Sequence, residues 1–388
     1  MSKRSASPPP NTSSSGGALI KRSKNSNDGP STSREIAISS NNDPRNKGLI
    51  RSVQRTSGLD APIISLAGAH AGEIFSCRFD PSGQNIAACS GDRSVSLWRT
   101  YAPHTNYGLL SNLAKAPILD LQWSLFQPLI YTVSADHLLS ILDVTTGQRI
   151  RKIRAHSGII NSIDRTMAGG AGSELIVTGS DDGTVKVWEC TDDDGVAKHP
   201  VANFDIGCPV TGVCWGKEGQ NIYVASLDNE IHVYDLRNSG SSTNNTIPRT
   251  TPLLSLSGHT DTPTSLSLSP DGNYLLSPSL SSNVLIHDIR PFSPSPTRVH
   301  RVLRGAPAGF ENTLLKGAWS RDEARVAVGG ADRMVCVWEV ETSKLLYKLP
   351  GHKGTVTSVD FHPKEPILLT GSKDGTMLLG ELEAGINV

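Results

Sequence analysis

The chain has 388 residues with equal numbers of acidic and basic side chains, and only 5% of its residues are aromatic. No apolar run approaches the roughly 20 residues of a membrane helix, and Lys3 and Arg4 have no apolar segment behind them, which excludes a membrane span and a secretory signal. The six cysteines form no Cys-x-x-Cys pair, which argues against a metal site and favours a reducing compartment.

The chain begins with a basic segment whose composition differs from the rest. Residues 1–60 contain ten Lys or Arg and four Asp or Glu, whereas the remainder contains 27 and 33. They are rich in Ser, Asn, Pro and Gly, so burial could not offset the entropy lost on ordering. We expect a disordered tail over 1–60 and one folded domain over 61–388. Basic clusters at Lys3 and Lys21 resemble a two-part nuclear import signal; a solvated tail and non-specific contact with RNA are the alternatives.

From residue 61 onward one unit recurs seven times, in its fullest form as SDDGTVKVW at 180–188. A turn residue is followed six positions later by an aromatic residue or a substitute: Asp92 and Trp98, Asp136 and Leu142, Asp182 and Trp188, Asp228 and Tyr234, Ser281 and His287, Asp332 and Trp338, Asp374 and Gly380. Successive turn positions are 44, 46, 46, 53, 51 and 42 residues apart, which is typical of four-stranded propeller blades. Within a unit, runs such as 73–79, 85–90 and 94–98 predict short antiparallel strands joined by Gly-containing turns. The pattern predicts an all-β propeller of seven blades in one domain.

These units resemble WD40 repeats. In that family a His before the first strand, a Ser or Thr on the second strand, the turn Asp and the Trp form a buried hydrogen-bonded chain. Carried over to this sequence, blade three has the complete set of His156, Thr178, Asp182 and Trp188. The other expected members of this structural network are His70, Asp92, Trp98, His259, Asp332, Trp338, His352, Thr370 and Asp374. Blade one has Ala88 at the hydroxyl position, blade seven has Gly380 in place of Trp, and blades two, four and six lack the His.

The two ends of the repeat region predict how the ring closes. The last unit ends after its third strand at 376–383, while 62–68 reads as a strand with no unit before it. In the WD40 family the N-terminal strand completes the last blade. This arrangement would remove two exposed strand edges.

The recurring His and Asp predict structure and not catalysis, because they occur once per blade. The sequence has no Gly-rich phosphate loop, no G-x-S-x-G and no His cluster at metal spacing, so we expect no catalytic, cofactor-binding or metal-binding residues. Function is then expected at surfaces. One group of candidate partner-binding residues lies at the blade turns and the starts of first strands: Arg93, Arg333 and Lys373, with Glu73, Asp181 and Leu227. A second group, Arg290, Phe292 and Phe310, lies within 290–312. This stretch departs from the blade pattern and contains two Ser-Pro steps.

Four segments resemble a narrower family, the WD-repeat subunits of the U5 small nuclear ribonucleoprotein of the spliceosome. They are APIISLAGAHAGEIFSCRF at 61–79, DIRPFSP at 288–294, GFENTLLKGAWS at 309–320 and LYKLPGHKGTVTSVDFHPKEPILL at 346–369. The resemblance implies a nuclear, non-catalytic scaffold for pre-mRNA splicing. It also implies a monomeric subunit that docks on the large U5 scaffold protein, in the particle that holds the U5 helicase and GTPase.

A second reading belongs to a different class. Substrate receptors of cullin-type ubiquitin ligases often present Trp-Asp-x-Arg at the end of a third strand. This chain has Tyr234-Asp235-Leu236-Arg237 and His287-Asp288-Ile289-Arg290, with the Trp missing from both. Co-purification of a cullin adaptor, in place of splicing proteins, would separate this reading from the first.

Overall fold

The computed structural model describes residues 57–167, 173–191, 195–196, 198–236, 251–293 and 295–382. The expected tail lies outside these ranges up to residue 56, and the described residues all belong to one compact unit, Val53–Val388. None of the described residues forms a helix long and apolar enough to cross a membrane.

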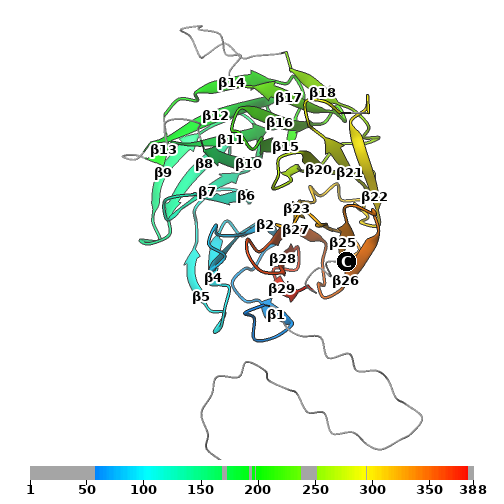
Figure 1. The fold of residues 1–388 in the computed structure, drawn as a ribbon. Coiled ribbons are helices and arrows are strands. Elements are labelled where there is room, and N and C mark those ends of the chain that lie inside the picture. Colours follow the sequence, from blue (N-terminus) through cyan, green and yellow to red (C-terminus); the bar gives the residue numbers. More distant parts are fainter. Residues whose placement is uncertain are drawn as a thin grey trace, which may run out of the picture. The chain divides into compact units, whose positions relative to one another are not determined.

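Strands alone build the described part of the chain, and they group into seven sheets around a ring (Figure 1). This confirms the predicted seven-bladed propeller. Blade one is β2 (Ile74–Phe79), β3 (Asn85–Ser90), β4 (Val95–Arg99) and β5 (Asn106–Leu110). Blade two is β6 (Ile118–Trp123), β7 (Leu129–Ser134), β8 (Leu138–Asp143) and β9 (Arg149–Arg154). Blade three is β10 (Ile160–Met167), β11 (Glu174–Ser180), β12 (Thr184–Thr191) and β14 (Ala202–Asp205), with a short β13 (Gly195–Val196).

The remaining blades follow in the same order. Blade four is β15 (Val210–Trp215), β16 (Asn221–Ser226), β17 (Ile231–Asp235) and β18 (Leu254–Leu256). Blade five is β19 (Ser267–Leu268), β20 (Tyr274–Pro278), β21 (Asn283–Asp288) and β22 (Val299–Arg304). Blade six is β23 (Gly317–Trp319), β24 (Arg325–Gly329), β25 (Val335–Glu339) and β26 (Leu345–Leu349). Blade seven is β27 (Val356–Phe361), β28 (Ile367–Ser372), β29 (Met377–Glu381) and β1 (Ile63–Leu66).

The apolar core lies between the blades. On β11, Ile176 packs in a cluster shared with blade two, whereas Leu175 and Val177 pack in a cluster shared with blade four. Seven such clusters occur among the described residues, and each draws on two neighbouring blades. Side chains on a strand alternate between the two faces of its sheet, so both faces of a blade must be apolar. The blades therefore stabilise one another by stacking.

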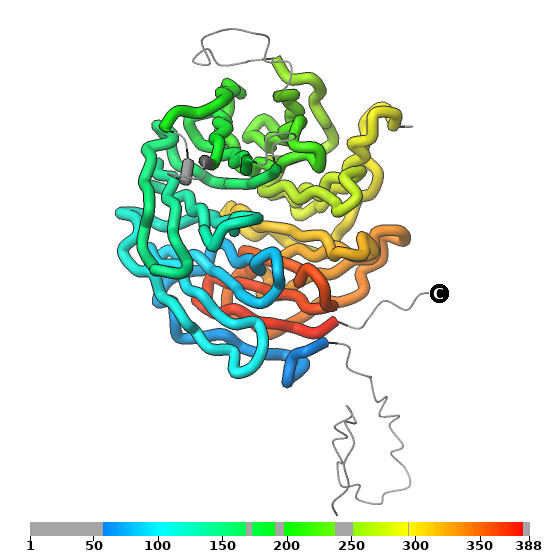
Figure 2. The backbone as a smooth tube through the Cα atoms, turned by 60° about the vertical axis from the view of Figure 1, so that its left-hand side comes forward, coloured from blue at the N-terminus to red at the C-terminus, as the bar shows by residue number. Residues whose placement is uncertain are grey.

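The N-terminal strand closes the ring as predicted. β1 pairs antiparallel with β29, from Ile63 opposite Gly380 to Leu66 opposite Met377, and Figure 2 shows the first and last strands side by side. The fold begins a few residues before the predicted boundary at 61, because Leu59 is buried in the cluster between blades seven and one. The backbone N–H of Gly58 also donates to Glu365 Oε2 over 2.7 Å.

The turn between the second and third strands has one backbone conformation in all seven blades. The residue after the turn Asp, or after Ser281, has a positive φ: Arg93 67°, His137 69°, Gly183 76°, Asn229 69°, Ser282 64°, Arg333 67° and Gly375 78°. Gly-containing turns were expected from the sequence, and the structure extends this conformation to turns without Gly. The hairpin geometry of the blade imposes the same conformation on residues that disfavour it by about 1–2 kcal/mol.

The stretch 290–312 contains a regular strand, which corrects the expectation of an irregular insertion. Residues 299–304 form β22, the outer strand of blade five, and its pairing with β21 brings Asn283 opposite Arg304. The sequence VHRVLR hides the strand because charged and apolar residues do not alternate regularly. Phe292 precedes this strand and Phe310 follows it, so the two rings lie at opposite ends of the blade.

Candidate interaction surfaces

Blade three contains a continuous chain of hydrogen bonds from its Trp to its turn Asp. Trp188 Nε1 donates to Thr178 Oγ1 over 3.0 Å, and Thr178 Oγ1 lies 2.9 Å from His156 Nε2. His156 Nδ1 lies 3.1 and 3.2 Å from the two oxygens of Asp182. A neutral imidazole that carries its proton on Nδ1 satisfies every one of these contacts. The four residues are thereby joined within one blade.

Burial and hydrogen bonding explain the protonation of this chain. Burial lowers the pKa of His156 and outweighs the opposing effect of Asp182. Burial alone would raise the pKa of Asp182, but hydrogen bonds from His156 and Thr184 lower it well below its usual range. The pair is therefore a neutral imidazole donating to a carboxylate. Its perturbed pKa values are a consequence of blade structure and give no evidence of catalysis.

Blade one builds the same chain with a hydroxyl from a different strand. His70 Nε2 lies 2.7 Å from Ser96 Oγ, which also accepts from Trp98 Nε1 over 3.0 Å. Ser96 lies on the third strand, two residues before Trp98, and replaces the hydroxyl that is absent at Ala88. The signal for it was present in the sequence, because residues two apart on a strand share a face.

Blades seven and five retain parts of the chain. In blade seven, His352 lies 2.8 Å from Thr370 Oγ1 and 3.3 Å from Asp374 Oδ2, with no Trp at position 380. In blade five, His259 Nε2 lies 2.8 Å from Ser277 Oγ, and His259 Nδ1 has no hydrogen-bond partner among the described residues.

The other three blades use different contacts. In blade six, Asp332 pairs with Lys348 over 2.7 Å and Trp338 Nε1 donates to the Arg304 carbonyl, so these two do not join a His-centred chain. In blade four the turn Asp228 binds His232, which lies on the third strand and was not anticipated. In blade two, Asp136 accepts from the backbone N–H of Lys115.

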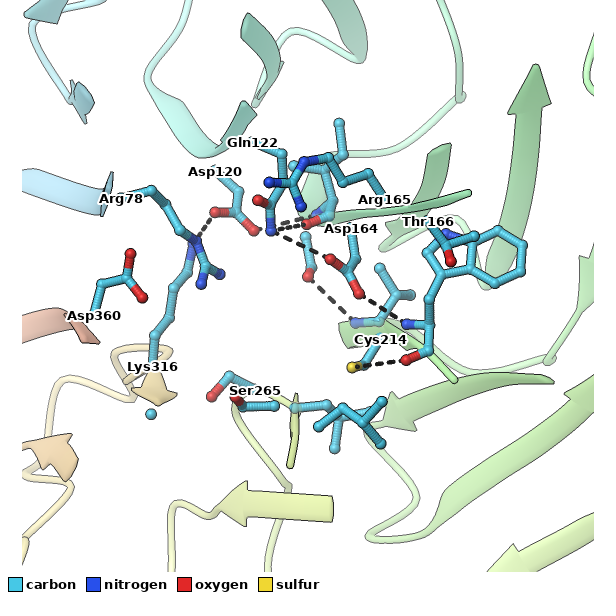
Figure 3. A pocket seen from close by; sticks show the side chains of 18 of the residues that line it. Arg78, Asp120, Gln122, Asp164, Arg165, Thr166, Cys214, Ser265, Lys316 and Asp360 are labelled. Carbon is cyan, nitrogen blue, oxygen red and sulfur yellow. Dashed lines mark hydrogen bonds and ion pairs between the residues drawn. The ribbon is translucent and has the colours of Figure 1, made fainter. Parts of the chain in front are cut away.

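The first strands of all seven blades line a polar cavity of about 420 Å³ on the ring axis (Figure 3). Lys316 of blade six reaches across it to Asp120 of blade two over 2.5 Å. Arg78 lies among carboxylates; burial opposes its charge, but Asp360, Asp120 and Asp164 raise its pKa. Asp164 and Asp360 also accept backbone N–H groups of the neighbouring blades, at Trp215 and Phe79. These charges hold neighbouring blades together, and sequence reasoning missed them because they act across the ring.

Two faces of the ring carry the candidate partner-binding residues. We call the side formed by the second-to-third-strand turns and the connections between blades the turn face. Arg93, Arg333, Asp181, Leu227 and Lys373 lie in those turns and Glu73 and Phe310 in those connections. Lys373 Nζ pairs with Glu311 over 2.7 Å and lies 3.8 Å from Glu73. Arg93 and Arg333 are exposed and form no ion pair within the described ranges.

Arg290 and Phe292 lie on the opposite face, in the connection between β21 and β22. Phe292 is 95% exposed, and Phe310 on the turn face is fully exposed. Arg290 binds Asp288 through Nε at 2.9 Å and Nη2 at 2.6 Å. In this candidate receptor motif the Arg is thus paired with the Asp of the same motif. Arg237 of the other motif lies outside the described residues.

No group of His, Cys, Asp or Glu in the described ranges has the arrangement of a metal site. All six cysteines are free, and burial raises the pKa of Cys77 to about 12 and that of Cys336 to about 11. Such thiols are poor nucleophiles and poor metal ligands.

Comparison with known proteins agrees with this architecture. The model of the WD domain, G-beta repeat family matches residues 61–99, 147–189, 199–235, 250–288, 312–339 and 343–379. The first three strands of blade two fall outside these matches, although the structure shows a regular blade there.

Relatives extend the similarity over the whole ring. The chain is 37% identical to the pre-mRNA-splicing factor cwf17 of Schizosaccharomyces pombe, over 85% of this chain and 90% of that protein. It is 37% identical to the U5 small nuclear ribonucleoprotein 40 kDa protein of Dictyostelium discoideum, over 86% and 88%. The human protein of that name is 35% identical, over 85% and 86%. This chain therefore belongs to the WD40-repeat family, and within it to the group formed by the U5 small nuclear ribonucleoprotein 40 kDa proteins and cwf17.

Proposed function

We propose that this protein is a non-catalytic scaffold subunit of the U5 small nuclear ribonucleoprotein and acts in pre-mRNA splicing in the nucleus. The observation that carries the proposal is the identity of 35–37% to proteins named as splicing components, sustained over 86–90% of their length. The recurrent His–Asp pairs support a non-catalytic role, since each is engaged within its own blade.

The expected partners follow from the same membership. We propose that the ring docks on the large U5 scaffold protein as a monomeric subunit, in the particle that contains the U5 helicase and GTPase. Exposed aromatics are favoured anchors of protein interfaces, and Phe292 and Phe310 are the most exposed of the large apolar side chains in the described ranges. Because they lie on opposite faces, each reports on a different docking surface.

The test is purification of the tagged full-length protein from the cells it comes from, followed by mass spectrometry and RNA sequencing. We expect U5 small nuclear RNA and splicing proteins to co-purify. Recovery of a cullin adaptor without splicing proteins would favour the ligase-receptor reading and contradict the proposal.

Single substitutions then assign the docking face. We expect either Phe292→Ser or Phe310→Ser to weaken recovery of the large scaffold protein while the melting temperature stays within a few degrees. Phe126→Ser is the matched control, since Phe126 is 60% exposed and lies in the β6–β7 connection of blade two, on the face of Phe292. Full recovery with both variants would place the docking surface elsewhere.

A further inference from the structure

Four exposed cations lie on segments of blades one and two that adjoin where the two blades meet, two of them on the turn face and two on the outer strand of blade two. They are Arg93, Lys115, Lys152 and Arg154, and we call them the basic patch. The carbonyl of Arg93 accepts the backbone N–H of Leu113 over 3.4 Å, which brings the turn of blade one to within two residues of Lys115. Lys152 and Arg154 lie on β9, the outer strand of blade two, at the edge of the ring (Figure 1).

The strand register directs the β9 cations toward this junction. Leu142 on β8 packs in the cluster between blades one and two, whereas Leu139 and Ile141 pack toward blade three. Lys152 is paired with Ser140 and Arg154 with Leu138, which share the side of Leu142. Paired residues on neighbouring strands project from the same face, so both cations face blade one.

The patch keeps its charge. None of its four side chains forms an ion pair or a hydrogen bond with any described residue. The nearest turn carboxylates are already engaged: Asp136 accepts Ser134 Oγ and the Lys115 N–H, and Asp92 binds His70. A fifth cation, Arg149, is tied to the Leu113 carbonyl over 2.5 Å beside the patch.

Protection of a strand edge does not account for this charge. Lys and Arg on edge strands discourage pairing with other chains. Among the outer strands, β1, β5, β14 and β18 carry no Lys or Arg, β26 carries one Lys and β22 two Arg, whereas β9 has four in six residues. The edges of this ring are therefore stable without such a concentration of cations, and β9 calls for another explanation.

We propose that the basic patch binds the phosphate backbone of RNA. Lys152 and Arg154 are two residues apart on one face, a spacing of about 6.6 Å that suits successive phosphates of an extended strand. Protein interfaces depend on apolar and aromatic anchors, whereas the exposed apolar side chain of β9, Ile150, is a single aliphatic residue beside exposed cations. Phosphate binding needs only the cations and is independent of base sequence. The choice of RNA among polyanions rests on the proposed membership of a ribonucleoprotein.

The test measures binding of a fluorescein-labelled, mixed-sequence single-stranded RNA to the full-length protein by anisotropy over a range of salt concentrations. The variant R93Q/K115Q/K152Q/R154Q removes the patch. The matched control R333Q/K344Q/K353Q/K364Q removes four exposed cations of blades six and seven, and it too includes one Arg with positive φ. Both variants keep the basic N-terminal segment, so its contribution is equal in each.

We expect the patch variant to bind at least about tenfold more weakly than the control variant at moderate salt. Its slope of log K against log salt should fall by up to about 2.8, since each phosphate contact on a single strand contributes about 0.7. Equal binding by the two variants, whether both weakened or both unchanged, would overturn the proposal. So would intact RNA binding together with loss of a protein from the pull-down. Patch-dependent RNA binding would stand even if no splicing protein co-purified, so the two proposals can fail separately.

Discussion

Blades three and five place the same imidazole at the same position and differ in what surrounds it. His156 of blade three is bonded at both nitrogens, to Thr178 and to Asp182. His259 of blade five is bonded at Nε2 to Ser277, and its Nδ1 has no partner in the described part of the chain, where Ser281 occupies the position of the turn Asp. His287 occupies the position of the Trp, and the centres of the His259 and His287 rings are 5.5 Å apart.

The two blades nevertheless share the same arrangement of four main strands, to which blade three adds the short β13. Leu276, Val284 and Ile286 of blade five are as deeply buried as Val177, Val185 and Val187 of blade three. The hydrogen-bonded chain therefore adds stability to a blade whose architecture is set by apolar stacking against its neighbours. Blade five is less stabilised than blade three because its buried imidazole has no carboxylate as a hydrogen-bond partner.

The largest difference between blades three and five is expected at the position of the Trp, where blade three has Trp188 and blade five has His287. Trp188→Ala should lower the free energy of unfolding by about 3–5 kcal/mol, because it leaves a large cavity and removes the donor to Thr178. His287→Ala should cost less, since the side chain is smaller. Chemical denaturation of both variants measures the difference. Equal losses would show that the Trp contributes nothing beyond the smaller ring.

The next largest difference in stability between blades three and five is expected at the turn residue. Asp182→Ala leaves His156 and the backbone N–H of Ser157 without their acceptor and should cost about 1–3 kcal/mol. Ser281→Ala removes no contact to His259 and should change stability by less than about 0.5 kcal/mol. A melt of Asp182→Ala identical to the parent protein would contradict the structural role of the network.

Acid should weaken blade five through its two imidazoles, and blade three first through His156, whose pKa burial also lowers, and then through Asp182. Burial lowers the pKa of His259 to about 3 and that of His287 to about 4, so the folded state resists protons that the unfolded chain binds below about 6.5. Stability should fall as the pH drops from about 6.5 to 4, by up to about 1.4 kcal/mol per pH unit for each His. The lowered pKa of Asp182 acts later, because its contribution is lost only as the pH falls below about 4.

Replacement of one imidazole tests this assignment. His259→Gln should shrink the stability difference between pH 7 and pH 5, as measured by urea denaturation at each pH. An unchanged difference would mean that the acid sensitivity arises from other groups, such as His70, His156 and His352, whose pKa values burial also lowers.

The smallest effect should come from giving blade five what it lacks. Ser281→Asp offers a carboxylate to His259 Nδ1 and should stabilise the protein by roughly 1 kcal/mol near neutral pH. It should also raise the pKa of His259, which nuclear magnetic resonance titration of the imidazole would detect. No gain in stability together with an unshifted pKa would show that the turn of blade five cannot present a carboxylate as blade three does.

Comparison of blades three and one shows how much of the hydrogen-bonded network of a blade could be predicted from its sequence. The resemblance to WD40 repeats predicted that His156, Thr178, Asp182 and Trp188 meet, and a hairpin that fixes the register of neighbouring strands brings them together. The same template failed at Ala88, where the structure uses Ser96, and at blade four, where His232 takes the place of the missing His. In blade one a residue on another strand completes the network, and in blade four His232 supplies only the contact to the turn Asp.

Short-range periodicity in the sequence set the number of blades and the positions of their turns, and the strand at 62–68 that has no unit before it, together with the resemblance to WD40 repeats, predicted how the ring closes. The tertiary structure decided what depends on contacts between distant residues. It links Lys316 to Asp120 across the ring axis. It places β22 between Phe292 and Phe310, a strand that the irregular pattern of its residues did not predict. It also joins the turn that carries Arg93 to the segment that carries Lys115, since packing of whole blades, and not local pattern, decides which surfaces adjoin.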